Sequence, residues 1–164
     1  MKTSSLRGGI YLAGGIGLLV AIFAAAEFYT ASLRGVCTIS QFFSCARVDQ
    51  SNYTTTLGIP DYLWGVGGFL VLLVVAGLAE RRPRDVRPAY LLTALATGAV
   101  ALSAYFLYVQ LALIHALCVV CASAEAFGVI VWIASIALAM RTARKAAADR
   151  GGLPRPTAKT GRSD

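Results

Sequence analysis

Four cysteines are the residues of this chain whose type and spacing point most directly to chemistry. Cys118 and Cys121 enclose two residues. Where a helix begins, this spacing is typical of a redox-active dithiol, because the helix N-terminus stabilises a thiolate and the small disulfide ring opens readily by exchange. The same spacing also fits a structural disulfide or half of a four-thiolate metal site. The motif alone leaves all three readings open.

A second pair, Cys37 and Cys45, is separated by seven residues that include Ser40 and Ser44. Small and polar residues of this kind favour a connection that can move. A mobile disulfide can exchange first with a soluble thiol partner and then with the C-x-x-C pair, whereas a rigid disulfide only braces the fold. The second pair therefore indicates either a relay or a brace.

The chain as a whole is too apolar for a protein surrounded by water. Of its 164 residues 57% are hydrophobic and 14% charged, and the mean hydropathy is +0.68. The basic residues fall in short clusters between long uncharged runs, which is typical of a chain that crosses a bilayer several times. We therefore expect contact with membrane lipid and none with nucleic acid. A disordered, collagen-like or small disulfide-stapled secreted protein is excluded.

Four runs are long enough to cross a bilayer, which needs roughly 20 apolar residues. They cover Gly8–Ala26, about Tyr62–Ala79, the segment after Pro88 to about Val109, and about Cys118–Met140. The sequence thus predicts an all-α membrane protein, a four-transmembrane-helix bundle over residues 1–144 with an extracytoplasmic cysteine loop between its first two helices. A flexible basic tail is predicted over residues 145–164.

The distribution of Lys and Arg predicts the orientation in the membrane. Connections on alternate sides of the predicted bundle hold 13 and 2 of these residues. Because cytoplasmic connections are enriched in Lys and Arg, both termini and the loop between the second and third helices are predicted to be cytoplasmic. The connections that carry all four cysteines are then extracytoplasmic. Thiols form disulfides on that side, so two cysteine pairs are expected.

The cysteine loop and the last predicted helix resemble the vitamin K epoxide reductase family. The shared pattern is Cys37, seven residues, Cys45-Ala46-Arg47-Val48, Ser51-Asn52-Tyr53 and Leu57-Gly58, followed by a C-x-x-C that opens the last helix. Another four-span family also generates disulfides. It resembles the bacterial quinone-linked oxidase that recharges the periplasmic dithiol oxidase, and it carries its C-x-x-C in the first outward loop and its separated cysteine pair in the second. In this chain the separated pair comes first and the C-x-x-C second.

This resemblance implies a four-helix bundle that holds a quinone near its outward face. It implies that Cys121 faces the quinone, that Cys118 is its partner in exchange, and that Cys37 and Cys45 form the shuttle pair. For a prokaryotic-type member it implies oxidative protein folding in the plasma membrane of a bacterium or archaeon. A DsbA-like, thioredoxin-like protein then delivers electrons, and a quinone (menaquinone, ubiquinone or vitamin K) removes them.

Three features depart from the family pattern. Val119 and Val120, inside the C-x-x-C, are similar to the animal form, whereas many bacterial members carry Pro-Tyr or a similar pair. The chain ends in a basic tail where some bacterial members carry a fused thioredoxin-like domain, so the redox partner is expected to be a separate polypeptide. Glu125 stands where the animal enzymes have a tyrosine that contacts the quinone.

Candidates for contact with the quinone are Cys121, Glu125, Tyr105 and Tyr108. Glu125 follows Cys121 by one helical turn, so it can hydrogen-bond a quinone oxygen, pass a proton, or pair with a polar group of another helix. Tyr105 and Tyr108 fit either an aromatic belt or the wall of a pocket. His115, the only histidine, is expected to be an interfacial polar residue, and no metal site is expected.

The sequence therefore predicts a thiol-dependent quinone oxidoreductase that supports disulfide formation. Electrons pass from the thioredoxin-like partner through Cys37/Cys45 and Cys118/Cys121 to a bound quinone. Two alternatives remain open: reductive action on vitamin K epoxide or on a quinone, and a non-enzymatic tetraspan whose loops are stapled by disulfides for partner binding.

Overall fold

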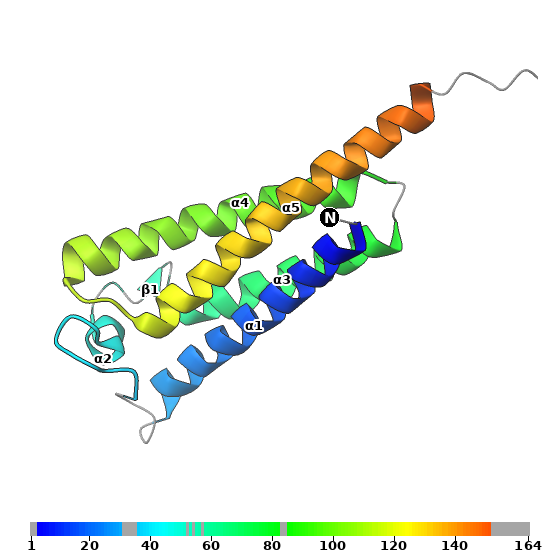
Figure 1. The fold of residues 1–164 in the computed structure, drawn as a ribbon. Helices are drawn as coiled ribbons and strands as arrows, with labels where there is room; N and C mark the ends of the chain where they lie inside the picture. Colours follow the sequence, from blue (N-terminus) through cyan, green and yellow to red (C-terminus); the bar gives the residue numbers. More distant parts are fainter. Residues whose placement is uncertain are drawn as a thin grey trace, which may run out of the picture.

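The computed structural model describes residues 3–30, 36–51, 53, 55–56, 58–82 and 85–151. Four of its helices are long and apolar enough to cross a membrane, and they lie side by side as a bundle (Figure 1). They are α1 (Thr3–Tyr29), α3 (Asp61–Arg81), α4 (Arg87–Tyr108), which a π-helical segment η1 (Val109–Ile114) continues, and α5 (Val119–Gly151). The predicted four-helix membrane bundle is confirmed.

Each long helix extends beyond the uncharged run that predicted it, because polar residues at its ends continue the helical backbone. α3 begins after Pro60, and its first residue, Asp61, accepts the backbone N–H of Tyr62 at 2.7 Å. α4 has a proline in its first turn, where the missing N–H costs no helical hydrogen bond. α5 runs past Lys145, where a flexible tail is predicted to begin, and ends at Gly151. Residues 152–164 of that predicted tail lie outside the described residues.

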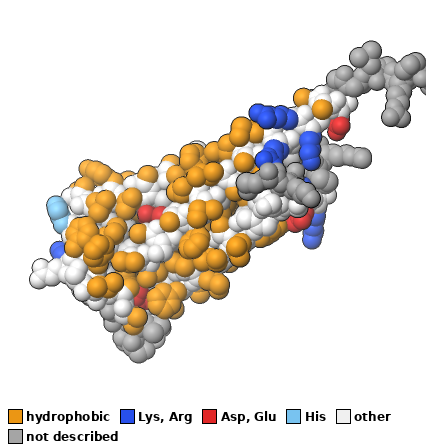
Figure 2. All heavy atoms as spheres, viewed as in Figure 1, with side chains coloured by type: hydrophobic (Ala, Val, Ile, Leu, Met, Phe, Trp, Pro, Cys, Tyr) orange, Lys and Arg blue, Asp and Glu red, His pale blue; other side chains and the backbone are white. Residues whose placement is uncertain are grey.

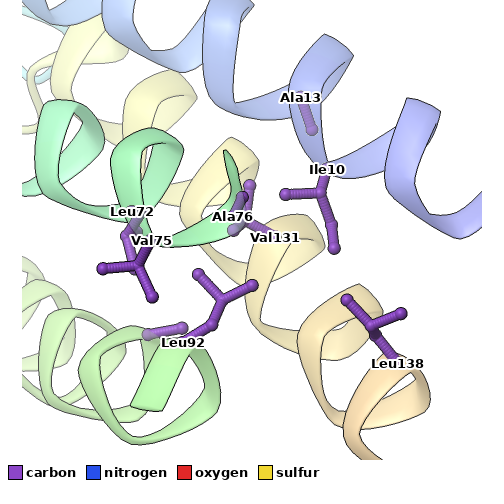
Figure 3. Packing of buried hydrophobic residues seen from close by; sticks show 9 residues of the cluster. Ile10, Ala13, Leu72, Val75, Ala76, Leu92, Val131 and Leu138 are labelled. Carbon is purple, nitrogen blue, oxygen red and sulfur yellow. The ribbon is translucent and has the colours of Figure 1, made fainter. Parts of the chain in front are cut away.

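The four long helices form a ring in which α1 and α4 each pack against both α3 and α5. Apolar side chains from all four helices meet at the centre of the ring (Figure 3). The buried cluster comprises Ile10, Ala13, Leu72, Val75, Ala76, Leu92, Ala96, Val131 and Leu138. Its small members allow helix backbones to approach closely, as is common between helices in membranes.

Glycine allows the closest approach between α1 and α3. A Cβ atom at Gly17 would overlap the ring of Phe69, and one at Gly14 would lie 2.9 Å from Leu73 Cδ2. Neither position has room for a larger residue without a shift of its neighbour. The contact between these helices therefore depends on the absence of side chains at two positions of α1.

The outer surface of the bundle is apolar along much of its length, with Lys and Arg side chains gathered mainly at one end (Figure 2). Large hydrophobic residues of every long helix are exposed there, among them Leu12, Leu19, Val74, Leu95 and Ile133. In water such a surface would be unfavourable, but lipid tails solvate it well. The surface therefore fits a multi-pass integral membrane protein.

A small cap covers the end of the bundle opposite the N-terminus (Figure 1). It follows α1 in the chain and contains the short helix α2 (Cys45–Asp49) and two strands, β1 (Thr55–Thr56) and β2 (Ile59–Pro60). The strands pair antiparallel as a hairpin, and Gly58 between them adopts a positive φ of 78°, which glycine tolerates best. This cap is the predicted cysteine loop between the first two long helices.

Candidate active site

Backbone hydrogen bonds tie the cysteine loop to the connection between η1 and α5. Phe43 and Leu117 form a parallel bridge, in which Leu117 N–H donates to the Phe42 carbonyl at 2.7 Å and Ser44 N–H donates to the Leu117 carbonyl at 3.2 Å. Phe43 lies two residues before Cys45, and Leu117 lies directly before Cys118. The bridge therefore holds Cys45 next to Cys118.

Cys45 lies at the start of α2, and Ser44 caps that helix by accepting the Arg47 N–H at 3.3 Å. Cys45 is joined to Cys37 by a disulfide, while Cys118 and Cys121 are free thiols. The Cys118 sulfur lies 3.2 Å from the Cys45 sulfur, and the two residues are 2% and 1% exposed. The Cys45 and Cys118 sulfurs are thus placed for thiol–disulfide exchange between the two pairs.

The backbone around Cys118 fixes the position of this residue. Cys118 directly precedes α5, as the predicted helix start at the C-x-x-C requires, and the Cys121 N–H donates to the Cys118 sulfur at 3.2 Å. In addition, the buried Gln110 side chain of η1 accepts the Cys118 N–H through Oε1 at 2.8 Å. Cys118 is therefore fixed on both its backbone and its sulfur side.

Cys37 is anchored to the end of α1. The side chain of Glu27 is buried and accepts the Cys37 N–H at 3.4 Å. Glu27 directly follows the first uncharged run, Gly8–Ala26, and was not among the predicted site residues. A buried carboxylate near the end of an apolar helix needs a donor, and this requirement is the signal that could have linked it to the cysteine loop.

A cavity of about 110 Å³ opens beside Cys121 and is lined by residues of all four long helices. Its polar residues are Cys121, Glu125, Asp61, Tyr62, Gln110 and Ser103. Its remaining walls are mainly apolar, with Trp64 and Phe69 from α3, Leu102 and Phe106 from α4, and small residues of α1. The sulfur of the second C-x-x-C residue is therefore next to an apolar chamber with few polar groups.

Two of the four predicted quinone contacts line this cavity, and two do not. Cys121 and Glu125 lie in its wall. Tyr105 and Tyr108 are 52% and 61% exposed and are not among the lining residues. On α4 the lining positions are spaced by a helical turn, from Leu102 to Phe106, so the two tyrosines fall on another face. Neither tyrosine lines this cavity, and the exposure of both fits the aromatic-belt alternative.

Sequence reasoning missed Asp61, Tyr62 and Gln110 as lining residues. Asp61 could have been suspected, because an acidic residue directly after Pro60 marks the start of a helix at the cysteine end. Gln110 could not, because its position depends on the π-helical turn of η1, which has no simple sequence pattern.

The three sulfurs of Cys37, Cys45 and Cys118 lie within 4.8 Å of one another. Such a group could bind a metal only as thiolates, so the Cys37–Cys45 disulfide would first have to be reduced. In the disulfide state, the arrangement is suited to exchange of one sulfur–sulfur bond for another.

Two redox-competent cysteine pairs that meet at one end of a membrane helix bundle, next to an apolar cavity, define a membrane thiol–disulfide oxidoreductase. The chain belongs to the Vitamin K epoxide reductase family, whose family model matches residues 9–139. A search of curated proteins finds no match to the chain. The family is linked to quinones in general.

The cavity fits a quinone by its own chemistry. The aromatic side chains of Trp64, Phe69 and Phe106 provide an apolar surface for a flat ring. Tyr62 is buried and lines the cavity, and within the described part of the chain its hydroxyl has no hydrogen-bond partner. A buried hydroxyl of this kind favours a ligand with an oxygen acceptor, and a quinone has two.

Proposed function

We propose that this protein oxidises the thiols of a separate thioredoxin-like, DsbA-like protein and passes the electrons to a bound quinone, thereby supporting disulfide formation. The observation that carries the proposal is the 3.2 Å separation of the Cys45 and Cys118 sulfurs. It joins the loop pair to the C-x-x-C pair, whose Cys121 lines the cavity. A structural staple would need no such contact between the two pairs.

Electron transfer through the protein proceeds by two exchanges. A reduced partner attacks the Cys37–Cys45 disulfide at Cys37, which is less buried than Cys45 and is flanked by exposed loop residues. The loop pair leaves this exchange as a dithiol. The Cys45 thiolate then attacks Cys118 of an oxidised Cys118–Cys121 pair, a Cys45–Cys118 bond forms, and Cys121 leaves as a thiolate facing the cavity. Cys37 next attacks Cys45, which restores the Cys37–Cys45 disulfide and releases Cys118. The two protons of the loop thiols pass to Cys118 and Cys121, which become the reduced dithiol.

The residues of the cavity hold the quinone and orient it. A bound quinone supplies a two-electron acceptor at this position. The aromatic walls would hold its ring, Tyr62 would donate to one of its oxygens, and Cys121 would present its sulfur to the ring. Closure of the cysteine loop over this end of the bundle limits entry of water.

The cysteine end faces the extracytoplasmic side in this proposal. The charge pattern of the sequence supports it, as does the gathering of Lys and Arg at the other end (Figure 2). Anionic lipid at the cytoplasmic surface would attract that basic end. Substrate proteins and their thiols are then on the same side as Cys37.

The test is anaerobic reduction of the purified protein, removal of the reductant, and addition of a short-chain ubiquinone or menaquinone, with quinol measured by its ultraviolet absorbance. We expect stoichiometric quinol from the wild type and less than about 1% of that rate from Cys121→Ser, because the thiolate that faces the cavity is gone. Tyr105→Phe is the matched control and should keep the wild-type rate. Full retention of quinol formation by Cys121→Ser would refute the proposal.

A further inference from the structure

Two carboxyl groups that thiol exchange does not use lie in the wall of the cavity beside Cys121. Asp61 is the first residue of α3, and Glu125 lies on α5 one helical turn beyond Cys121. Asp61 interacts electrostatically with both Cys121 and Glu125. The thiol and the two carboxyl groups therefore form one group of proton carriers in an otherwise apolar chamber.

Two carboxylates in one apolar cavity cannot both be charged without a large cost, so such a pair is most stable with one shared proton. Asp61 is the better site for the negative charge. Its Oδ1 accepts the Tyr62 N–H at 2.7 Å, and it lies in the first turn of α3, where the helix dipole favours an anion. Glu125 lies beyond the first turn of α5 and keeps the proton.

We propose that Asp61 and Glu125 form a proton-transfer pair that carries protons from the Cys118/Cys121 dithiol to the quinone oxygens. The inference rests on the proposed function. Asp61 takes the proton of the Cys121 thiol, and Glu125 donates its proton to a quinone oxygen. A proton then passes from Asp61 to Glu125, which restores the pair for a second transfer.

The reaction balances without a further reagent. Two S–H bonds break and one S–S bond forms between Cys118 and Cys121, which releases two electrons and two protons. Both electrons and both protons are transferred to the quinone, which gives the quinol with two new O–H bonds. The carboxyl pair ends with the one proton with which it began.

Other ionisable groups near the pair are few. Asp49 of α2 interacts electrostatically with Cys121, and Tyr62 lines the cavity. The described lining residues of α1 and α4, and Gln110 of η1, carry no titratable side chain. Asp61 and Glu125 are therefore the carboxyl groups in the cavity wall that can serve the thiol and the quinone together.

The test compares Asp61→Asn and Glu125→Gln, which keep side-chain shape, with Glu80→Gln as control. Glu80 is an exposed carboxyl near the other end of the same helix α3. With excess short-chain ubiquinone, we expect quinol formation to fall on the order of 100-fold in either cavity variant, as is typical when a general acid or base is lost. The double variant should be little slower than the slower single variant, because the two groups act as a unit.

A second readout needs neither quinone nor turnover. The infrared spectrum of the quinone-free protein should contain the C=O band of a protonated carboxyl group, which Glu125→Gln removes and Glu80→Gln leaves unchanged. The conservative variants Asp61→Glu and Glu125→Asp keep a carboxyl group and should recover most of the lost rate. Their recovery separates proton transfer from a loss of folding.

The outcomes distinguish the two proposals. If the wild type forms no quinol, the proposed function fails, and the pair has no reaction to serve. If the wild type forms quinol, but both cavity variants match Glu80→Gln across the pH range, the pair is refuted and the proposed function stands. Absence of the protonated-carboxyl band from the folded wild type also overturns the pair.

Discussion

At the scale of single residues, the two loop cysteines differ in what they can reach. The Cys45 sulfur lies 3.2 Å from that of Cys118, and both residues are buried together with Ala116 and Val48. Sequence spacing could assign Cys37 and Cys45 to one pair, but it could not say which of them meets Cys118. That choice depends on the bridge between two connections that are far apart in the chain.

This difference predicts how fast a disulfide forms in variants that keep only two of the four cysteines. In Cys37→Ser/Cys121→Ser protein, mild oxidation should rapidly form a Cys45–Cys118 disulfide, because the two sulfurs already lie in contact. The control Cys45→Ser/Cys118→Ser leaves Cys37 and Cys121 and should oxidise at least about tenfold more slowly, in keeping with lost proximity. Thiol-specific gel-shift labelling over time measures both rates. Equal rates would contradict the assignment of Cys45 to the exchange.

The hydrogen bond from the Cys118 N–H to the Gln110 side chain should contribute to the stability of the protein. Gln110→Met keeps the approximate volume of the side chain but leaves the buried Cys118 N–H without its acceptor. We expect the free energy of unfolding to fall by about 1–3 kcal/mol. Gln110→Glu, which keeps a carbonyl oxygen at the same place, should lose less stability. Detergent-induced unfolding followed by circular dichroism measures the order, and a Gln110→Met protein as stable as the wild type would contradict it.

At the scale of helices, the uncharged runs were enough to predict the four spans. A segment inside lipid must pair its own backbone N–H and C=O groups, and an α-helix does this within one segment. The same rule says nothing of η1 or of the cap. The cap is joined to the connection before α5 by the Phe43–Leu117 bridge, and η1 ends at His115, whose backbone is left-handed at φ 56°. These are contacts between distant segments, so hydropathy along the chain could not predict them. The facing direction of Tyr105 and Tyr108 was open for the same reason.

Close packing of α1 on α3 yields a prediction for the cavity wall. Gly17→Ala should place a Cβ atom against the ring of Phe69, which lines the cavity, so overpacking should cost about 1–3 kcal/mol of stability and displace that wall. Gly15→Ala on the same helix meets no atom within 4 Å and is the control. Thermal unfolding and the KM for short-chain ubiquinone measure the two effects. If Gly17→Ala and Gly15→Ala behave alike, the close approach of these helices is wrong.

At the scale of the whole molecule, Lys and Arg gather mainly at the end of the apolar bundle opposite the cap, in which α2 begins at Cys45 (Figures 1 and 2). Counting Lys and Arg along the sequence was enough to predict this separation, because alternate connections of a four-span bundle meet at the same end. Because cytoplasmic connections are enriched in Lys and Arg, the basic end is predicted to face the cell interior, and this orientation can be tested directly. The sites needed are exposed positions at each end.

Tyr53 is exposed at the cysteine end, and Arg82 is exposed where α3 ends at the other. In protein whose four native cysteines are replaced by serine, Tyr53→Cys should react with a membrane-impermeant maleimide added to intact cells or spheroplasts, whereas Arg82→Cys should react only after lysis. The reason is that moving the basic end outward would oppose the charge bias that orients helical membrane proteins. A membrane-permeant maleimide, which should label both variants, controls for folding and expression. Reaction of Arg82→Cys from outside would place the cysteine pairs in the reducing cell interior, where they could not act as an oxidase for extracytoplasmic thiols.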